Sequence, residues 1–249
     1  MAVSQIHIRS ISLPSRLHPI NSTEFEAEVE KLKSSQASTV GLTSDSIISG
    51  LVGLAELYSS MDELTQAPSR IDDALEGSVE LLDCCSSIRE VVQMMRESVR
   101  GLQSALRRNS ALQNDVASYM GSRKRMSKCI KKILKALDRI HASREVYALS
   151  VAVFRSALLF FSSSAVKCGG WNVVARLLLN KSAAHHGVVN EVGCVDLALS
   201  NAEFDKQMLQ RGLQNLESCV DGIEGALERM YRNLLRTRVN LLNILTNHL

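Results

Sequence analysis

Histidine and cysteine are among the side chains that could ligate a metal or act as nucleophiles, but their spacing in this chain does not favour either role. His185 and His186 are adjacent, so on a helix their side chains point about 100° apart and cannot easily share one ion. Cys84 and Cys85 are adjacent in the same way. The six cysteines include no CxxC pair, so neither a structural zinc site nor a disulfide framework is indicated. We therefore predict no metal site and no bound cofactor.

The motifs of common catalytic and nucleotide-binding sites do not occur in the sequence. It contains no GxxxxGKS/T, GxGxxG, HExxH or GxSxG pattern, whose spacings build phosphate loops, zinc helices and nucleophile elbows. We therefore predict no enzymatic activity and no catalytic residue. The alternative is an enzyme with polar groups in a helical-bundle pocket, and it would require buried His, Asp, Glu or Cys side chains that converge in one cavity.

A strongly basic segment is the clearest candidate for a binding surface. From Arg100 to Arg144 there are twelve Lys or Arg residues and two Asp residues. A basic amphipathic helix can contact anionic lipid headgroups or an acidic protein. The plainer interpretation is a solvated face that is balanced by acidic helices of the same chain. The candidate contacts are Lys124, Lys128, Lys131, Lys132, Lys135 and Arg139.

The spacing of these cations predicts one helix face. Four of the lysines recur at i, i+4, i+7 and i+11, and this stripe lies opposite Ile130, Ile133 and Leu137 on a helical wheel. We do not expect nucleic acid to bind there, because no aromatic side chains interleave with the cations to stack on bases.

The N-terminal segment contains a candidate phosphorylation switch. Arg9, Ser10, Ser12 and Pro14 lie within RSISLP. Phosphorylated Ser12 would place a dianion three residues after an arginine and two before a proline, the arrangement that helical adaptors of the 14-3-3 type bind with arginine clusters. We therefore expect protein partners, including a phosphoserine-binding adaptor that recognises this segment.

Long helices must position these candidate sites. The three prolines are Pro14, Pro19 and Pro68, so none occurs from Ser69 onward, and proline is costly inside helices. Residues 1–21 lack sustained periodicity and are predicted to form a disordered tail, and residues 22–249 to form a single helical-bundle domain. Apolar periodicity predicts helices near 22–37, 45–65, 69–108, 126–161, 171–179 and 209–244, with a loop at 180–193.

Two details of this helical pattern are left open. The run from Met126 to Phe161 predicts either one unusually long helix or two helices stacked in register. Ser44–Asp45 is expected to cap the second helix, and Ser22 or Thr23 the first.

The most regular apolar pattern lies near the C-terminus. Steps of four and three residues are typical of left-handed coiled-coil packing, within one chain or between chains. We favour an antiparallel bundle within one chain. The residues in this pattern are Leu209, Leu213, Leu216, Val220, Ile223, Leu227, Met230 and Leu234.

The location of the protein has three interpretations. Val146–Ala165 is apolar enough to span a membrane, but Arg155 at its centre would be costly there, which favours a buried bundle helix. The N-terminus is rich in Ser and Arg and free of acids up to Thr23, so a plastid transit peptide is a further alternative. We predict a cytoplasmic protein with peripheral membrane contact.

The tail sequence HIRSISLPSRLHP, from His7 to Pro19, resembles the opening of the plant BYPASS-like family, a domain of unknown function. The similarity continues in GLAELYSSMDELTQAP (53–68), in Asp83–Cys84 and in the RKR-containing stretch Gly121–Lys132. Family members often have serine where this chain has Leu17. The resemblance implies a plant protein that influences root and shoot development, with control of a root-derived mobile signal in the founding branch and no assigned catalytic chemistry.

Together these observations predict an all-α fold, an elongated bundle of long antiparallel helices with coiled-coil-like packing. We predict a non-enzymatic regulatory or interaction protein in plant development, which acts on an anionic membrane or an acidic partner. The alternative is an enzyme or accessory factor in the synthesis or clearance of a small mobile signal. The sequence leaves the oligomeric state open.

Overall fold

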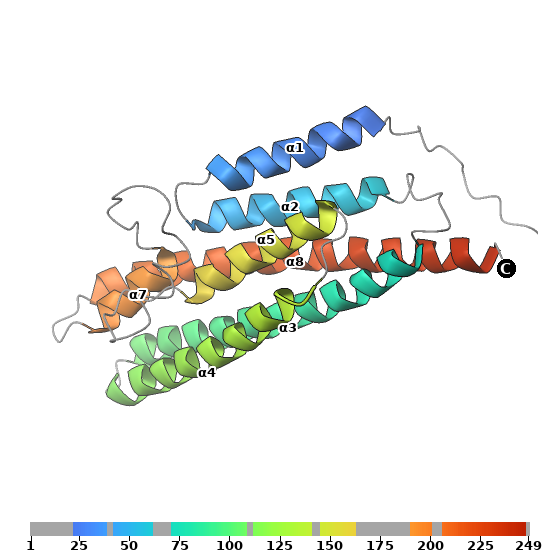
Figure 1. Ribbon diagram of the computed structural model, residues 1–249. Helices are drawn as coiled ribbons and strands as arrows, with labels where there is room; N and C mark the ends of the chain where they lie inside the picture. The colour runs from blue at the N-terminus through green and yellow to red at the C-terminus, as the bar shows by residue number, and fades with distance from the viewer. Residues whose placement is uncertain are drawn as a thin grey trace, which may run out of the picture.

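The computed structural model describes residues 22–38, 42–61, 71–108, 112–140, 145–162, 190–200 and 206–247, and every secondary-structure element in these ranges is an α-helix. The helices form an elongated bundle, as the all-α prediction required (Figure 1). The predicted tail (1–21) and the predicted helix at 171–179 lie outside the described residues. The helices are α1 (Ser22–Ser38), α2 (Ser44–Met61), α3 (Ile71–Arg108), α4 (Gln113–Leu137), α5 (Glu145–Ser162), α7 (Glu191–Ser200) and α8 (Lys206–Asn247).

Helix α8 is the central element of the bundle. Its 42 residues correspond to a length of about 63 Å, and it packs most extensively against α3 and α2, with α7 beside it. The apolar stripe predicted from the sequence faces these neighbours, which confirms that it packs within the chain. The eight side chains of this stripe are fully buried, namely Leu209, Leu213, Leu216, Val220, Ile223, Leu227, Met230 and Leu234.

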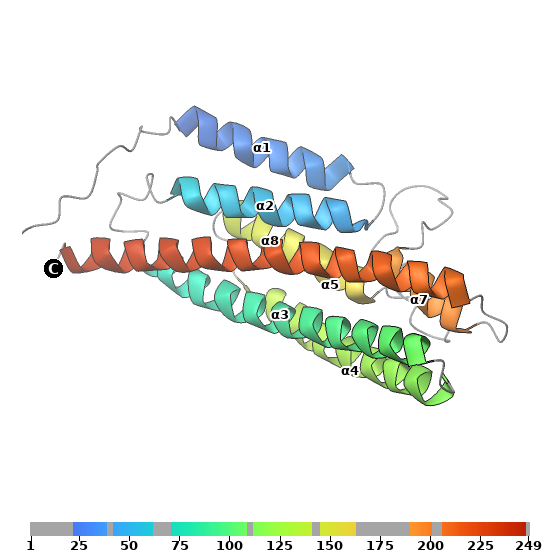
Figure 2. The ribbon, with the colours of Figure 1, turned by 180° about the vertical axis from the view of Figure 1, so that it is seen from behind.

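Helices α3 and α2 run in opposite directions along α8. The contacts Arg100–Glu217 and Arg89–Glu228 show that residue numbers rise in α3 as they fall in α8, so these two helices are antiparallel. Thr237 Oγ1 donates a hydrogen bond to the Tyr58 carbonyl at 3.0 Å, near the C-terminal ends of α8 and α2, so these two are parallel. Figure 2 shows α8 and α3 side by side along most of their length.

The pattern from Met126 to Phe161 forms two helices, so of the two alternatives that the sequence left open, the single long helix is wrong. Helix α4 ends at Leu137, a turn follows at 138–140, and α5 packs back against α4 in the opposite direction. Arg155 Nη2 lies 2.5 Å from Asp138 Oδ1 and ties α5 to the end of α4. The spacing of apolar residues stays in step from α4 through the turn into α5, because both helices bury their apolar side chains in the same core.

The helix termini differ from the sequence prediction at three places, the largest difference being that α4 begins at Gln113 and not near Met126. Thr43, not Ser44, caps α2, because its Oγ1 accepts a hydrogen bond from the Ser46 amide at 3.3 Å. Helix α7 begins at Glu191, so residues 191–193 of the predicted loop are helical, and Asn190 Oδ1 caps α7 by accepting from the Gly193 amide at 2.9 Å.

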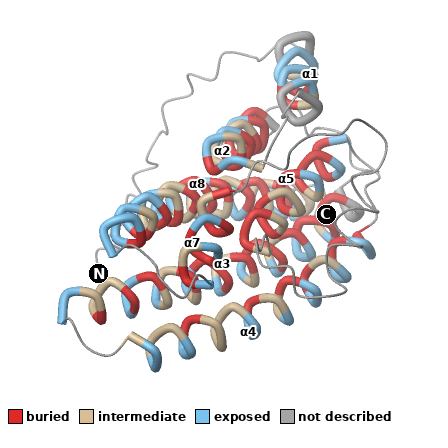
Figure 3. Tube along the Cα trace, turned by 90° about the vertical axis from the view of Figure 1, so that its left-hand side faces the viewer, coloured by how far each residue is buried: buried red, intermediate tan, exposed pale blue. Residues whose placement is uncertain are grey.

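Helix α5 is the one described helix whose length and hydropathy would allow it to span a membrane. It covers 18 residues with a mean hydropathy of 1.4, and 56% of that span is buried inside the bundle. Helices α1, α2, α3 and α4 all contact it. Figure 3 shows its buried residues within the bundle, and Phe160 and Phe161, which pack edge to face, are fully buried among them.

Candidate functional site

The six cations predicted from the sequence lie together on the solvent side of α4. We call Lys124, Lys128, Lys131, Lys132, Lys135 and Arg139 the α4 basic face; all six are exposed, and Arg139 lies in the turn just after the helix. Helix α4 lies at the edge of the bundle, with its exposed residues outward (Figure 3). The solvent exposure of these residues is therefore as predicted, and their contact with an anionic surface stays a prediction.

Apolar spacing explains why α4 turns this face to solvent. Its buried residues recur every three, four or seven positions, so burying this stripe directs the lysines outward. The stripe packs against α3 and α5. The buried residues are Tyr119, Met126, Ile130, Ile133 and Leu137.

Among the residues that the structure describes, most cations of the α4 basic face have no acidic partner. Among the described residues, no acid forms an ion pair with Lys124, Lys128, Lys132, Lys135 or Arg139. The acids of α8 instead contact the arginines of α3. The two acids within the basic segment are also paired with other residues: Asp138 with Arg155, and Asp115 with Arg108 at 4.0 Å.

Arg123, next to this face, points into the protein and joins three helices. Its Nε and Nη2 donate to Asp196 Oδ2 of α7 at 3.2 and 3.0 Å, and its Nη1 donates to the Phe161 carbonyl at the end of α5 at 2.5 Å. Tyr119 Oη donates to Asp196 Oδ1 at 2.9 Å. Burial and the Asp196 carboxylate raise the pKa of Tyr119, so its hydroxyl stays protonated. This cluster fixes the orientation of α4 on the bundle.

A second polar cluster joins α2, α7 and α8. Ser44 Oγ donates to Glu191 Oε1 at 2.8 Å, and Cys219 Sγ lies 3.2 Å from Ser44 Oγ and 3.6 Å from Glu191 Oε1. Burial and the Glu191 carboxylate raise the pKa of the Cys219 thiol, although the Ser44 hydroxyl opposes this. A nucleophilic cysteine requires a lowered pKa, so this arrangement is that of a structural thiol.

Sequence reasoning missed both clusters. Asp196 did carry a signal, since it is an isolated acid in the apolar helix EVGCVDLALS, and a buried acid needs a partner. Ser44, Glu191 and Cys219 lie up to 175 residues apart in sequence, and nothing in their local context indicates that they meet.

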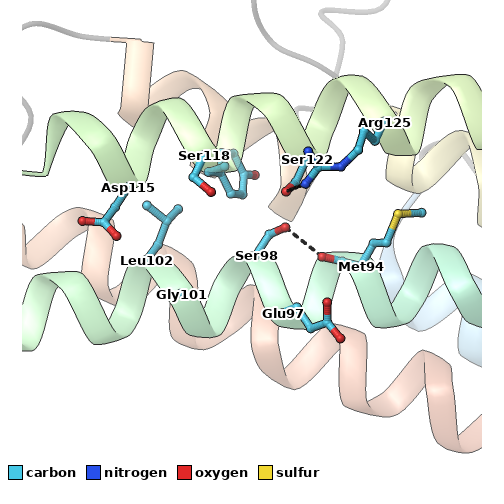
Figure 4. A pocket seen from close by; sticks show the side chains of 10 residues that line it. Met94, Glu97, Ser98, Gly101, Leu102, Asp115, Ser118, Ser122 and Arg125 are labelled. Atoms are coloured by element: carbon cyan, nitrogen blue, oxygen red, sulfur yellow. Dashed lines mark hydrogen bonds between the residues drawn. The ribbon is translucent and has the colours of Figure 1, made fainter.

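A small polar pocket lies between α3 and α4. Its volume is about 230 Å³, below the range of most ligand sites. Ser98 Oγ donates to the Met94 carbonyl at 2.7 Å, and Arg125 Nη2 donates to Ser122 Oγ at 2.8 Å, so several polar groups of the lining are already satisfied. Figure 4 shows the lining residues, which are Met94, Glu97, Ser98, Gly101, Leu102, Asp115, Ser118, Tyr119, Ser122 and Arg125.

Neither histidine nor cysteine lines this pocket, and within the described ranges no group of three or more His, Cys, Asp or Glu side chains is arranged to hold a metal ion. The phosphorylation motif formed by Arg9, Ser10, Ser12 and Pro14 lies outside the described residues, as does His185–His186. The predictions for those segments therefore remain predictions.

Comparison with known proteins identifies a family. The family described as Protein BPS1 matches residues 50–244, which include α3, α4, α5, α7 and most of α2 and α8. No curated protein and no solved structure matches the chain. Because the match covers more than half of the sequence, the chain belongs to the BPS1 (BYPASS) family of plant developmental regulators.

Proposed function

We propose that this developmental regulator is a non-enzymatic protein that binds anionic membrane surfaces through the α4 basic face. The observation that carries the proposal is the contrast between two sets of cations. Arg89, Arg96 and Arg100 of α3 are paired with acids of α8, whereas five of the six cations of the α4 basic face have no acidic partner among the described residues. Cations without an acidic partner in the described part of the chain are available for an external anion.

The expected strength of the interaction follows from the number of cations. Each Lys or Arg near an anionic bilayer contributes about 1 kcal/mol, and the attraction falls off over about 8 Å at physiological ionic strength. Six cations on one face therefore favour a peripheral contact that is reversible and weakened by salt. Deep insertion is not expected, because the exposed side of α4 is polar and its apolar residues face α3 and α5.

The test is co-sedimentation of the full chain with neutral and with anionic liposomes, at low and at high salt. The variant Lys124→Glu/Lys128→Glu/Lys135→Glu reverses the three lysines most nearly opposite the buried stripe. Loss of three favourable contacts of about 1 kcal/mol each should weaken binding to anionic vesicles by about 100-fold or more. Circular dichroism should show unchanged helicity, because all three side chains are exposed.

A matched control reverses three exposed cations elsewhere on the bundle. The variant Lys31→Glu/Arg107→Glu/Arg211→Glu changes the net charge by the same amount but leaves α4 intact. It should retain most of the binding. Equal loss in both variants would mean that net charge alone drives adsorption, which would overturn the proposed face. No salt-sensitive binding to anionic vesicles by folded wild-type protein would overturn the membrane proposal and favour an acidic protein partner.

The liposome assay does not test two further functional predictions. The first is that Ser12 is phosphorylated and recognised by an adaptor, which concerns the N-terminal segment.

The second is an enzymatic role in the synthesis or clearance of a mobile signal, which would need an activated group. The Cys219 cluster and the pocket at Asp115 offer no such group, so we do not propose this role.

A further inference from the structure

The solvent-facing side chains along the contact between α3 and α8 are charged at one end of the bundle and apolar at the other. At the charged end, Arg100 Nε lies 3.4 Å from Glu217 Oε1, and Arg96 pairs with Asp221 and Glu224. These ion pairs are spaced by about one helical turn and cover the solvent-facing side of the contact between the two helices.

The ionic part of this contact ends at Arg89. Its Nη2 lies 2.8 Å from Glu228 Oε2, and its guanidinium carbon lies 5.3 Å from the centre of the Tyr231 ring. Toward the C-terminal end of α8 the same side of the contact becomes apolar.

The apolar part is a surface patch of six side chains. Leu235, Val239 and Leu242 recur at i, i+4 and i+7 on α8 and are 43%, 48% and 40% exposed, respectively. Helical geometry places them on the side of α8 that carries Glu217, Asp221 and Glu228 farther along. On α3, Val79 is 39% exposed, and Leu75 and Leu82 are partly buried beside it. We call these six residues the α3–α8 apolar patch.

The register of the two helices brings the two halves of the patch together. Arg238 Nη1 donates to the Leu75 carbonyl at 2.6 Å and to Ser78 Oγ at 2.9 Å, so this part of α8 lies against the first turns of α3. The antiparallel pairing therefore sets Val79 beside Val239. It places Leu75 opposite Leu242, and Leu82 opposite Leu235. Figure 2 shows the C-terminal part of α8 alongside the beginning of α3.

The two long edges of the patch carry opposite charges. Exposed acids flank it on the α3 side, at Glu76, Glu80 and Asp83. Exposed arginines flank it on the α8 side, at Arg232 and Arg236. The Arg232 side chain is 73% exposed although it contacts Glu228 one turn away, so it remains accessible.

An apolar centre with one acidic and one basic edge is complementary to a copy of itself. When two such patches meet about a two-fold axis parallel to the helices, the acidic edge of each copy faces the basic edge of the other. Glu80 and Arg236 lie at nearly the same level along the bundle, because the antiparallel register pairs residue 80 with about residue 237. A two-fold axis across the helices would instead place acid against acid and arginine against arginine, which is unfavourable.

We propose that the α3–α8 apolar patch is the interface of a symmetric homodimer, in which α3 of one copy packs on α8 of the other. This inference goes beyond the proposed membrane contact and is independent of it, because it uses another face of the bundle. Exposed apolar patches with polar rims mark interaction sites, and two-fold dimers with isologous interfaces are the commonest homo-oligomers. Six apolar side chains with charged edges form a small interface, so the dimer should dissociate at about micromolar concentration.

The test is analytical ultracentrifugation of the full chain over a range from about 0.1 to 100 μM, a span chosen around that estimate. The wild-type protein should pass from the monomer mass of 27.4 kDa to twice that mass. Arg236→Glu should weaken the dimer by about tenfold or more, because the new carboxylate of each copy then faces Glu80 of the other. The double variant Glu80→Arg/Arg236→Glu restores opposite charges in both symmetric contacts and should restore dimerisation.

Control variants separate the interface from general effects of charge and folding. Arg211→Glu makes the same charge change on α8, 25 residues before Arg236, and should leave the dimer intact. Val239→Glu should abolish it while helicity and the melting midpoint stay close to wild type, since that side chain is half exposed. A protein that is monomeric at 100 μM, a dimer indifferent to Arg236→Glu, or a double variant that fails to recover would each overturn the proposal.

Discussion

The buried cluster around Arg123 gives the sharpest prediction about stability. The Arg123 and Asp196 side chains are 11% and 4% exposed, so Arg123→Ala would leave a carboxylate buried without its counter-ion. Breaking a buried pair from one side costs about 3 to 5 kcal/mol. The substitution also removes the donor to the Phe161 carbonyl, so α4 would lose the Arg123 hydrogen bonds to both α5 and α7.

Urea and thermal unfolding followed by circular dichroism measure this loss. For a chain of this size a change of 1 kcal/mol shifts the melting midpoint by about 2 to 4 °C, so we expect a decrease of about 6 to 20 °C. Arg155→Ala is the matched control: it breaks the Arg155–Asp138 pair, whose side chains are 34% and 59% exposed, and should cost less than about 1 kcal/mol.

A double variant tests the stated cause of the loss. Arg123→Met/Asp196→Leu removes both charges and should recover much of the stability, because no unpaired ion remains in the interior. A cost for Arg123→Ala no greater than that for Arg155→Ala would refute the reasoning. The same conclusion would follow if the double variant were as unstable as the sum of the two single variants.

Three other predictions use the same unfolding assay. Gly77→Ala should destabilise the protein by about 1 to 3 kcal/mol, because the added Cβ would lie 2.8 Å from the Tyr147 ring. Gly101→Ala should stabilise it by up to about 1 kcal/mol, because the added Cβ would meet no atom within 4 Å beyond the nearby backbone of its own helix. Equal effects of the two substitutions would contradict this reasoning. Burial raises the pKa of Cys85 from 9.0 to about 12, so between pH 9 and 12 the thiol is ionised in the unfolded chain and protonated in the folded one. This thiol alone should therefore lower the free energy of unfolding by about 1.4 kcal/mol per pH unit over that range. Cys85→Ala should lessen that slope by the same amount, and an unchanged slope would contradict the assignment.

Sequence periodicity predicted the helices and much of the core. The stripe from Leu209 to Leu234 is buried as predicted, and the solvent exposure of Lys124 and Lys128 follows from the same rule, because an apolar stripe leaves the opposite face to water. The sequence left open whether the run from Met126 to Phe161 is one helix or two, since apolar spacing can stay in step across two helices that share one core.

Contacts between distant residues explain the rest of what the sequence did not reveal. Arg123 looked like one more cation of the basic run, and only the position of Asp196, 73 residues later, turns it inward. The exposed Val79 and Val239 are ordinary helix residues when each is considered alone. They form a patch only through the antiparallel register of α3 and α8, which depends on tertiary packing and not on local spacing.

The order of the helices along the chain also affects how the protein is made. Helix α8 covers α2 and α3, yet it follows both in sequence, so their apolar faces stay uncovered until its 42 residues leave the ribosome. At a synthesis rate of about 5 to 20 residues per second, this wait lasts many seconds, during which chaperones would have to protect the nascent chain. A premature stop codon within α8 should therefore act as a null allele, because the truncated product cannot close its core and would be degraded.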